Sequence, residues 1–161
     1  MSSGPAVAGP EHCCSRLGAV QIAVLNGVNL DALAERDPAL YGGIGLGELE
    51  TQIYAWAREM DCTARCFQTN YEGQFVDWCH EVRRWAGGVI VNPGAWTHYS
   101  YAIRDAIELF SVHVVEVHLS NIEQREEWRR HSVLADVVGH RIIGKGPEGY
   151  KEALEWLAES S

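Results

Sequence analysis

The sequence predicts an α/β fold in which helices cover both faces of a five-stranded parallel sheet. Five apolar runs of strand length alternate with four segments that repeat apolar residues at helical spacing. No internal repeat or linker interrupts this alternation, so the 161 residues are expected to form one domain. Right-handed crossovers between parallel strands then favour a flavodoxin-like three-layer sandwich.

The elements follow in a regular order. Strands are expected at residues 20–25, 62–67, 88–92, 112–118 and 137–143, where the chain carries short apolar runs. The first helix should bury one face formed by Leu46, Leu49, Ile53, Trp56, Ala57 and Met60. The second and third repeat this spacing at Phe75, Val76, Cys79, Val82 and Ala86, and at Ala102, Ile103, Ala106, Ile107 and Phe110. The last does so at Tyr150, Ala153, Leu154, Leu157 and Ala158.

Composition limits the class of protein. Residues 1–18 are rich in Ser, Gly, Pro and Ala and are expected to be a mobile tail, not a secretory signal, before a single catalytic domain at 19–161. The net charge of −9 argues against a general nucleic-acid binder, and the apolar runs are too short to span a membrane. The spacing of the five cysteines fits neither a Cys-x-x-Cys pair nor a zinc site, which predicts a cytoplasmic protein without disulfides or a metal.

Polar residues collect where the first four strands end. They are Asn26 and Asn29, Gln68 and Asn70, Asn92 and His98, and Glu116, His118, Ser120 and Asn121. The carboxyl ends of parallel strands meet at one edge of the sheet, where α/β proteins bind ligands. The segment from Asn26 to Tyr41 is long for a loop in a compact domain, which also points to function.

Arg36 and Tyr41 are the residues of that loop best suited to acid–base chemistry. A phenol is a poor base near neutrality unless a cation stabilises the phenolate, and Arg36 lies five residues before Tyr41. The alternative is that Tyr41 covers the core while Arg36 is solvated.

Two histidines are candidates for proton transfer. His118 lies two residues after Glu116, so both side chains leave the same face of a strand, and the carboxylate can raise the basicity of the imidazole. His98 follows a Pro-Gly turn at the expected start of a helix that Thr97 would cap. The alternatives are a structural His–Glu pair and a surface histidine.

Arg125 and Arg129 are four residues apart, so a helix would bring both guanidinium groups to one side, where they suit a carboxylate ligand. A salt-bridged helix face with Glu126 and Glu127 is the alternative. The glycine pairs at 45–47 and 144–146 lack the spacing of a dinucleotide loop, so no nucleotide cofactor is expected.

A series of motifs occurs in order along the chain: Asn26-Gly-x-Asn29, Arg36-x-Pro38 with Tyr41-Gly42, Gln68-x-Asn70-x-Glu72-Gly73, Asn92-Pro-Gly-Ala-x-Thr-His98, Ser100 with Ala102-x-Arg104-Asp105-Ala106, Glu116-Val-His-x-Ser-Asn121, Arg125-Glu126-x-x-Arg129 and Gly149-Tyr150. Together these segments, over about residues 20–157, resemble the type II 3-dehydroquinate dehydratases of the shikimate and quinate pathways. The ordered set is far more specific than any one motif.

The resemblance implies anti elimination of water from 3-dehydroquinate through an enolate, without metal or cofactor. It implies that Tyr41 removes the C2 proton, that Arg36 holds Tyr41 as phenolate, and that His118, oriented by Glu116, protonates the departing hydroxyl. Asn29 would stabilise the enolate. The implied substrate-binding residues are Asn92, His98, Leu119, Ser120, Arg125 and Arg129, with Asp105 acting across a subunit contact in a trimer that assembles into a dodecamer.

The loop after the first strand departs from the family pattern at Val28, Asp31, Ala34 and Asp37, so loop closure is where a difference is expected. Asp31 would add negative charge near Arg36 and is expected to compete for that guanidinium group. The only lysines, Lys145 and Lys151, lie away from the strand ends, which argues against the imine chemistry of type I enzymes. Two alternatives stay open: an enzyme for a related cyclic hydroxy acid, and a non-catalytic binding module.

Overall fold

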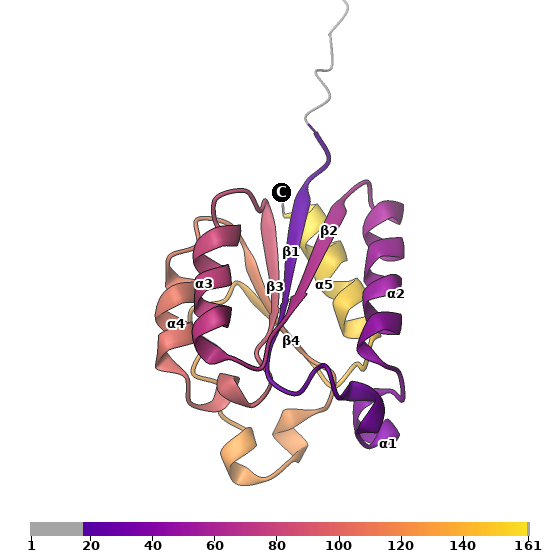
Figure 1. Cartoon of the computed structure of the whole chain (residues 1–161), viewed down its shortest axis with the longest axis vertical. Coiled ribbons are helices and arrows are strands. Elements are labelled where there is room, and N and C mark those ends of the chain that lie inside the picture. Colours follow the sequence, from indigo (N-terminus) through magenta and orange to yellow (C-terminus); the bar gives the residue numbers. More distant parts are fainter. Residues whose placement is uncertain (1–17, 161) are drawn as a thin grey trace, which may run out of the picture.

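The computed structural model describes residues 18–160, which form one parallel five-stranded sheet between two layers of helices (Figure 1). The strands are β1 (Gln21–Asn26), β2 (Thr63–Gln68), β3 (Gly88–Asn92), β4 (Val114–His118) and β5 (His140–Ile143). The helices are α1 (Pro38–Tyr41), α2 (Leu46–Glu59), α3 (Glu72–Val82), α4 (Tyr101–Glu108) and α5 (Glu148–Glu159). The spatial order β2-β1-β3-β4-β5 is that of flavodoxin-like folds, so the predicted fold class is confirmed.

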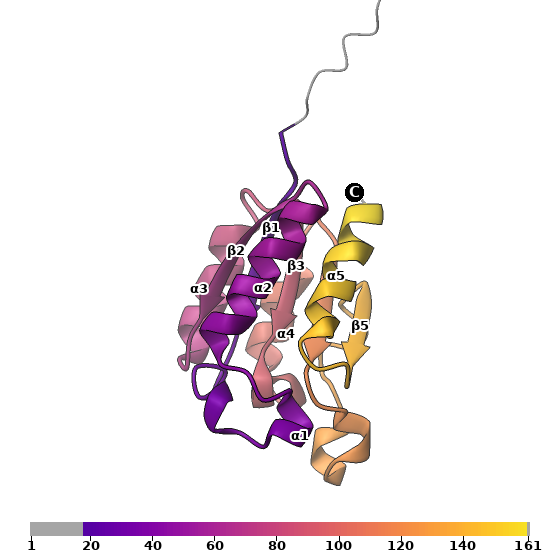
Figure 2. The ribbon, with the colours of Figure 1, turned by 90° about the vertical axis from the view of Figure 1, so that its right-hand side faces the viewer.

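The two faces of the sheet are buried under different helices. Figure 2 shows α2 and α5 on one side and α3 and α4 on the other. Alternate residues of β1 point to opposite faces: Ile22 and Val24 pack under α2 and α5, whereas Ala23 and Leu25 pack under α3 and α4. Because both faces are covered, β1 is a continuous apolar run without polar alternation.

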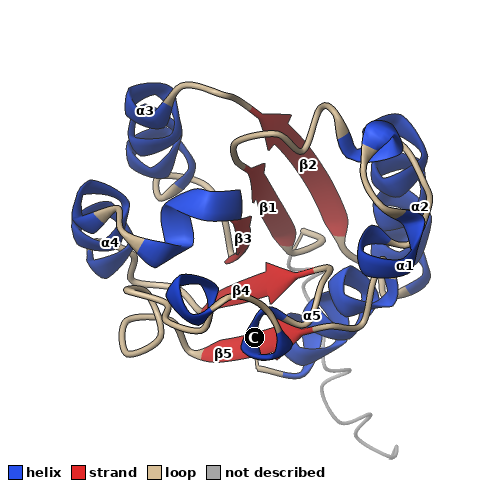
Figure 3. Ribbon diagram, turned by 90° about the horizontal axis from the view of Figure 1, so that it is seen from below, coloured by secondary structure: helices blue, strands red, loops and turns tan. Residues whose placement is uncertain are grey.

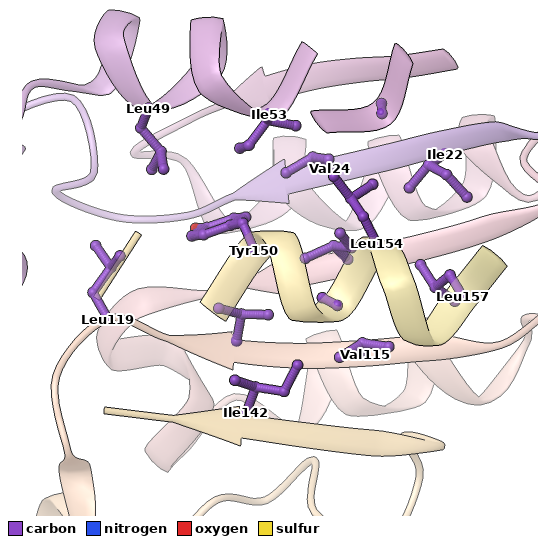
Figure 4. Packing of buried hydrophobic residues seen from close by; sticks show 14 of the residues in the cluster. Ile22, Val24, Leu49, Ile53, Val115, Leu119, Ile142, Tyr150, Leu154 and Leu157 are labelled. Carbon is purple, nitrogen blue, oxygen red and sulfur yellow. The ribbon is translucent and has the colours of Figure 1, made fainter. Parts of the chain in front are cut away.

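The core beneath α2 and α5 is filled mainly by aliphatic side chains. In Figure 4, Leu154 and Leu157 of α5 lie on the same side of the sheet as Leu49 and Ile53 of α2. All four are at most 1% exposed. Tyr150 is buried among them, with its hydroxyl at the end of the core nearest the carboxyl ends of the strands.

Some boundaries differ from the prediction. β5 begins at His140, because Val137 and Val138 lie in a turn and pack against the core under α3 and α4 without joining the sheet. Similarly, β4 begins at Val114 and not at Val112. Apolar character therefore identified residues that pack against the core, but it placed the starts of β4 and β5 two and three residues too early.

The chain between β4 and β5 contains two short 3-10 turns, Ile122–Gln124 and Glu127–Arg129, where helical spacing had suggested an α-helix. Arg125 separates them in an extended conformation, with φ −101° and ψ −168°. The expectation that Arg125 and Arg129 share a helix face is therefore wrong.

The carboxyl ends of all five strands lie at one edge of the sheet. Figure 3 views this edge and shows α1 and the β4–β5 connection around it. Residues 1–17 of the expected tail lie outside the described residues. Between residues 18 and 160, no helix is long and apolar enough to cross a membrane.

Candidate active site

A cavity opens at the carboxyl ends of β1, β3 and β4, where the strand order reverses. Five of its lining residues, Val28, Leu30, Gly94, Ala95 and Ile122, are small or apolar. The other nine were all predicted as site residues: Asn29, Arg36, Tyr41, Asn92, His98, His118, Leu119, Ser120 and Arg129. The topology therefore brings together polar segments that lie up to about a hundred residues apart in the sequence.

Tyr41 is presented to the cavity by a one-turn helix. Asp37 caps α1 by accepting a hydrogen bond from the backbone N–H of Ala39 at 2.9 Å, and Pro38 occupies the first turn, where its lack of an N–H carries no cost. Gly42 ends the helix with φ +87°, and a Cβ there would lie 2.7 Å from Pro147. The residues around Tyr41 thus fix the position of its backbone at the end of α1.

The hydroxyl of Tyr41 accepts hydrogen bonds from two guanidinium groups. Arg36 donates through Nη2, and its Cζ lies 3.9 Å from the centre of the Tyr41 ring. Arg125 donates through Nη1 at 3.0 Å, and this hydrogen bond is the largest of the causes that raise the pKa of Arg125. Two permanent cations on one half-buried oxygen stabilise negative charge there. Arg125 therefore contacts Tyr41, a partner that spacing did not suggest.

His118 and Glu116 form a buried pair on the other side of the cavity. His118 Nε2 lies 2.8 Å from Glu116 Oε1, and Glu116 is completely buried. Burial alone would raise the pKa of Glu116, but hydrogen bonds from His118 and Thr97 and the charges of His118 and Arg141 lower it to about 2. An ionised carboxylate holds the imidazole with a proton on Nε2, as the proposed orienting role requires.

His98 stacks beside His118. The two ring centroids are 6.5 Å apart with an angle of 16° between the planes, and His98 Nδ1 lies 2.7 Å from the carbonyl oxygen of His131. Burial is the main cause that lowers the pKa of His98, and the nearby charges of His118 and Arg129 lower it further. His98 is therefore held largely neutral, so it can accept or donate hydrogen bonds to a polar ligand.

The helix after His98 does not begin where the sequence suggested. α4 starts at Tyr101, and Ser100 caps it by accepting a hydrogen bond from the N–H of Ile103 at 3.1 Å. Thr97 is buried instead and donates its hydroxyl hydrogen to Glu116. The expected capping role of Thr97 is therefore wrong, because Thr97 lies inside a 3-10 turn over Gly94–His98 and not directly before α4.

Asn70 fastens the start of the loop after β1. Its Oδ1 accepts a hydrogen bond from the N–H of Asn29 at 2.8 Å, and its Nδ2 donates to Asp31 Oδ2 at 2.7 Å. Asn29 has φ +65°, a left-handed conformation that asparagine tolerates better than most residues. The expectation that Asp31 competes for Arg36 is wrong, because the carboxylate of Asp31 binds Asn70.

Asn92 is fixed from beneath the cavity by a buried chain of hydrogen bonds. Its Nδ2 donates to the hydroxyl of Tyr150 at 2.9 Å, and Tyr150 donates to Asn26 Oδ1 at 2.7 Å. Burial raises the pKa of Tyr150 well above its ordinary value, so the hydroxyl keeps its proton for this bond. Asn26 and Asn92 end two adjacent paired strands, β1 and β3, and Tyr150 ties the strand ends together.

Comparison with known proteins identifies the family of this chain. The family model for class II dehydroquinases matches residues 20–158, from before β1 to the last turn of α5. The chain belongs to the class II dehydroquinase family.

Relatives and solved structures of that family cover more than four fifths of this chain. A 3-dehydroquinate dehydratase from Bacillus pumilus is 51% identical over 134 residues, covering 83% of this chain and 91% of its own. The 3-dehydroquinate dehydratase from Deinococcus radiodurans is 47% identical over 137 residues, covering 84% and 96%. The crystal structure of a type II dehydroquinase from Propionibacterium acnes superimposes with a TM-score of 0.85 at 40% identity, covering 88% and 97%.

Three of the predicted residues, Glu116, Arg125 and Asp105, lie outside the cavity lining. Glu116 is hydrogen-bonded to the His118 ring, and Arg125 is hydrogen-bonded to the hydroxyl of Tyr41. Asp105 is exposed on α4 and does not line the cavity. Arg129 lines it, with its Nε 3.0 Å from Glu126 and its Cζ 4.0 Å from the centre of the Trp128 ring.

Sequence reasoning missed Ser132, Arg141 and the hydroxyl of Tyr150. Ser132 and Arg141 both donate to Glu116, at 2.9 and 2.8 Å. They lie in a connection and an edge strand without local motifs, so only the paired register of β4 and β5 could have found Arg141. Within residues 18–160, no group of three or more His, Cys, Asp or Glu side chains is placed to hold a metal ion.

Proposed function

We propose that this chain is a 3-dehydroquinate dehydratase that eliminates water with anti geometry, using Tyr41 as base and His118 as general acid. The observation that carries the proposal is the pairing of two chemically opposite groups in one cavity. Two arginines donate to the phenol oxygen of Tyr41, while a buried carboxylate binds the imidazole of His118. Family membership points to the same reaction.

The steps follow from these environments. Tyr41, as a phenolate held by Arg36 and Arg125, takes the proton from C2, and the C–H electron pair forms an enolate. The enolate then expels the hydroxyl group at C1, which leaves as water with a proton from His118 and gives 3-dehydroshikimate. Proton exchange with solvent returns both residues to their starting states. No metal or cofactor enters this sequence.

Charge stabilisation and substrate binding have separate candidates. Asn29 stabilises the enolate, and its left-handed backbone, held by Asn70, directs the side chain to the cavity. Donors that line the cavity bind the ring hydroxyls and the carboxylate; they are Asn92, His98, Leu119, Ser120 and Arg129. Arg125, the other expected binding residue, lies outside the lining and contributes through Tyr41 and through Ser120, to which its Nη1 donates at 3.4 Å. The anionic substrate then meets local cations in a chain of net charge −9.

Asp105 has a place in this proposal only in an assembly. It is exposed on α4 and outside the cavity of its own chain, so it would reach the site of a neighbouring copy in a trimer, and four trimers would form a dodecamer. Light scattering coupled to gel filtration measures the assembly. A mass near 17.9 kDa, that of one chain, would remove this role for Asp105.

The reaction is tested by mixing the protein with 3-dehydroquinate and following the ultraviolet absorbance of the conjugated enone. Tyr41→Phe should abolish turnover and leave the circular dichroism spectrum unchanged, whereas Tyr71→Phe, at an exposed tyrosine on the surface, should keep full activity. Turnover by Tyr41→Phe would refute the assignment of the base. Binding of 3-dehydroquinate without turnover by the native chain would favour the non-catalytic module instead.

A further inference from the structure

We propose that Arg141, on the edge strand β5, is a positioning residue that sets the proton affinity of His118 through the buried carboxylate of Glu116. The proposal rests on the proposed role of His118 as general acid. It assigns a function in catalysis to a side chain that does not line the cavity.

The geometry places one carboxylate between a guanidinium group and an imidazole ring. Glu116 and Arg141 are register partners across β4 and β5, and Arg141 Nε donates to Glu116 Oε2 at 2.8 Å. The other oxygen, Oε1, lies 2.8 Å from His118 Nε2. Glu116 is completely buried, while the side chain of Arg141 remains about a quarter exposed. Arg141 thus places a permanent positive charge against the carboxylate oxygen of Glu116 that does not bind His118.

The other groups around this pair are neutral or more distant. Thr97 and Ser132 donate hydroxyl hydrogens to Glu116, and His98 stacks on His118 from the turn after β3. Arg129 adds positive charge near His98. Among residues 18–160, Arg141 is the one arginine or lysine that forms an ion pair with Glu116.

This arrangement has two effects on proton transfer. A neighbouring carboxylate raises the proton affinity of an imidazole, and in a simple pair that would make the imidazolium a weak acid. Arg141 shares the same negative charge and adds a positive one, so it lowers the proton affinity of His118. It also keeps Glu116 ionised, which preserves the orientation of the ring. Glu116 therefore still orients the His118 ring. With Arg141 present, the imidazolium is a stronger acid than it would be beside Glu116 alone.

The test is the titration of the His118 ring by NMR in the full-length protein, with its signal assigned by its loss in His118→Asn. Arg141→Met, which removes the charge and keeps most of the aliphatic stem, should move the midpoint to higher pH by about one unit. The alkaline limb of the pH profile of kcat/KM for 3-dehydroquinate should move in the same direction. Arg65→Met is the matched control on the opposite edge strand β2, where the guanidinium lies over Trp85, and it should move neither.

An unchanged midpoint in folded Arg141→Met would overturn the proposal, because a merely structural arginine would not affect the titration. If that variant does not fold, Arg141→Gln keeps a hydrogen-bond donor for Glu116 without the charge. It should show the same upward shift, and an unchanged midpoint there would overturn the proposal equally. The NMR shift is separable from the reaction: a shift in a protein without turnover would reject the proposed function and retain the coupling.

Discussion

The stability of this fold in acid should depend strongly on Glu116. Replacing it by Gln removes a carboxylate whose pKa is about 2 in the fold, against an ordinary value of 4.5. A group with a lowered pKa stabilises the folded state above its unfolded pKa, and this contribution is lost as the pH falls toward the folded pKa. Here the window runs from about pH 5 down to about pH 2. The shift corresponds to roughly 3 kcal/mol of pH-dependent stability at 1.36 kcal/mol per unit.

The assay is urea unfolding followed by tryptophan fluorescence at a series of pH values across that window, with all proteins at the same concentration. Other carboxylates titrate in both proteins and cancel in the difference. The free-energy difference between the native chain and Glu116→Gln should therefore narrow by about 3 kcal/mol from pH 5 to pH 2. Glu155→Gln, at an exposed position of α5, provides the control and should show a constant difference. A constant difference for Glu116→Gln as well would refute the reasoning, because the pKa of the Glu116 carboxyl would then be the same in the folded and unfolded states.

Three further substitutions test the supports of the site. Ser100→Ala removes the cap of α4 and should lower the free energy of unfolding by about 1 kcal/mol in urea; no loss would mean the cap is replaced by water. Tyr150→Phe leaves Asn26 and Asn92 without their shared partner and should cost about 2 kcal/mol in thermal unfolding, while an unchanged midpoint would show that these amides re-pair. Asp31→Ala frees Asn70 and should raise KM for 3-dehydroquinate about three- to tenfold with little change in stability; an unaltered KM would show that other contacts hold the loop.

The fold was predictable because its signals are local. Apolar runs and helical spacing depend only on which residues are buried, and the five strands and four main helices all appear. The same signals misplaced the start of β5, because Val137 and Val138 pack partly buried against the core without pairing in the sheet. They also suggested a helix through Arg125, where the backbone is extended between two turns. Burial and hydrogen-bond pairing are different properties, and periodicity reports only the first.

At the site, pairs of residues close together in the sequence were predictable, whereas contacts between distant segments were not. Arg36 and Tyr41 are five residues apart, and Glu116 and His118 two apart, so spacing alone suggested both pairs. Arg125 reaches Tyr41 from 84 residues away. Contacts of this kind depend on tertiary packing, so no sequence pattern within the loop or the strand predicts them.

The two halves of the site use burial and charge in opposite ways. Glu116 is negative and completely buried, so the fold must supply its donors from several segments, and it does so from the turn after β3, from β4, from the β4–β5 connection and from β5. Tyr41 ends the short helix α1 in the connection between β1 and α2, and its hydroxyl accepts hydrogen bonds from two arginines that stay partly exposed. In the proposed mechanism, the general acid is therefore held by fully buried contacts and the base by partly exposed ones. Changes in the loop should consequently alter how the base is brought to the substrate before they alter the acidity of His118.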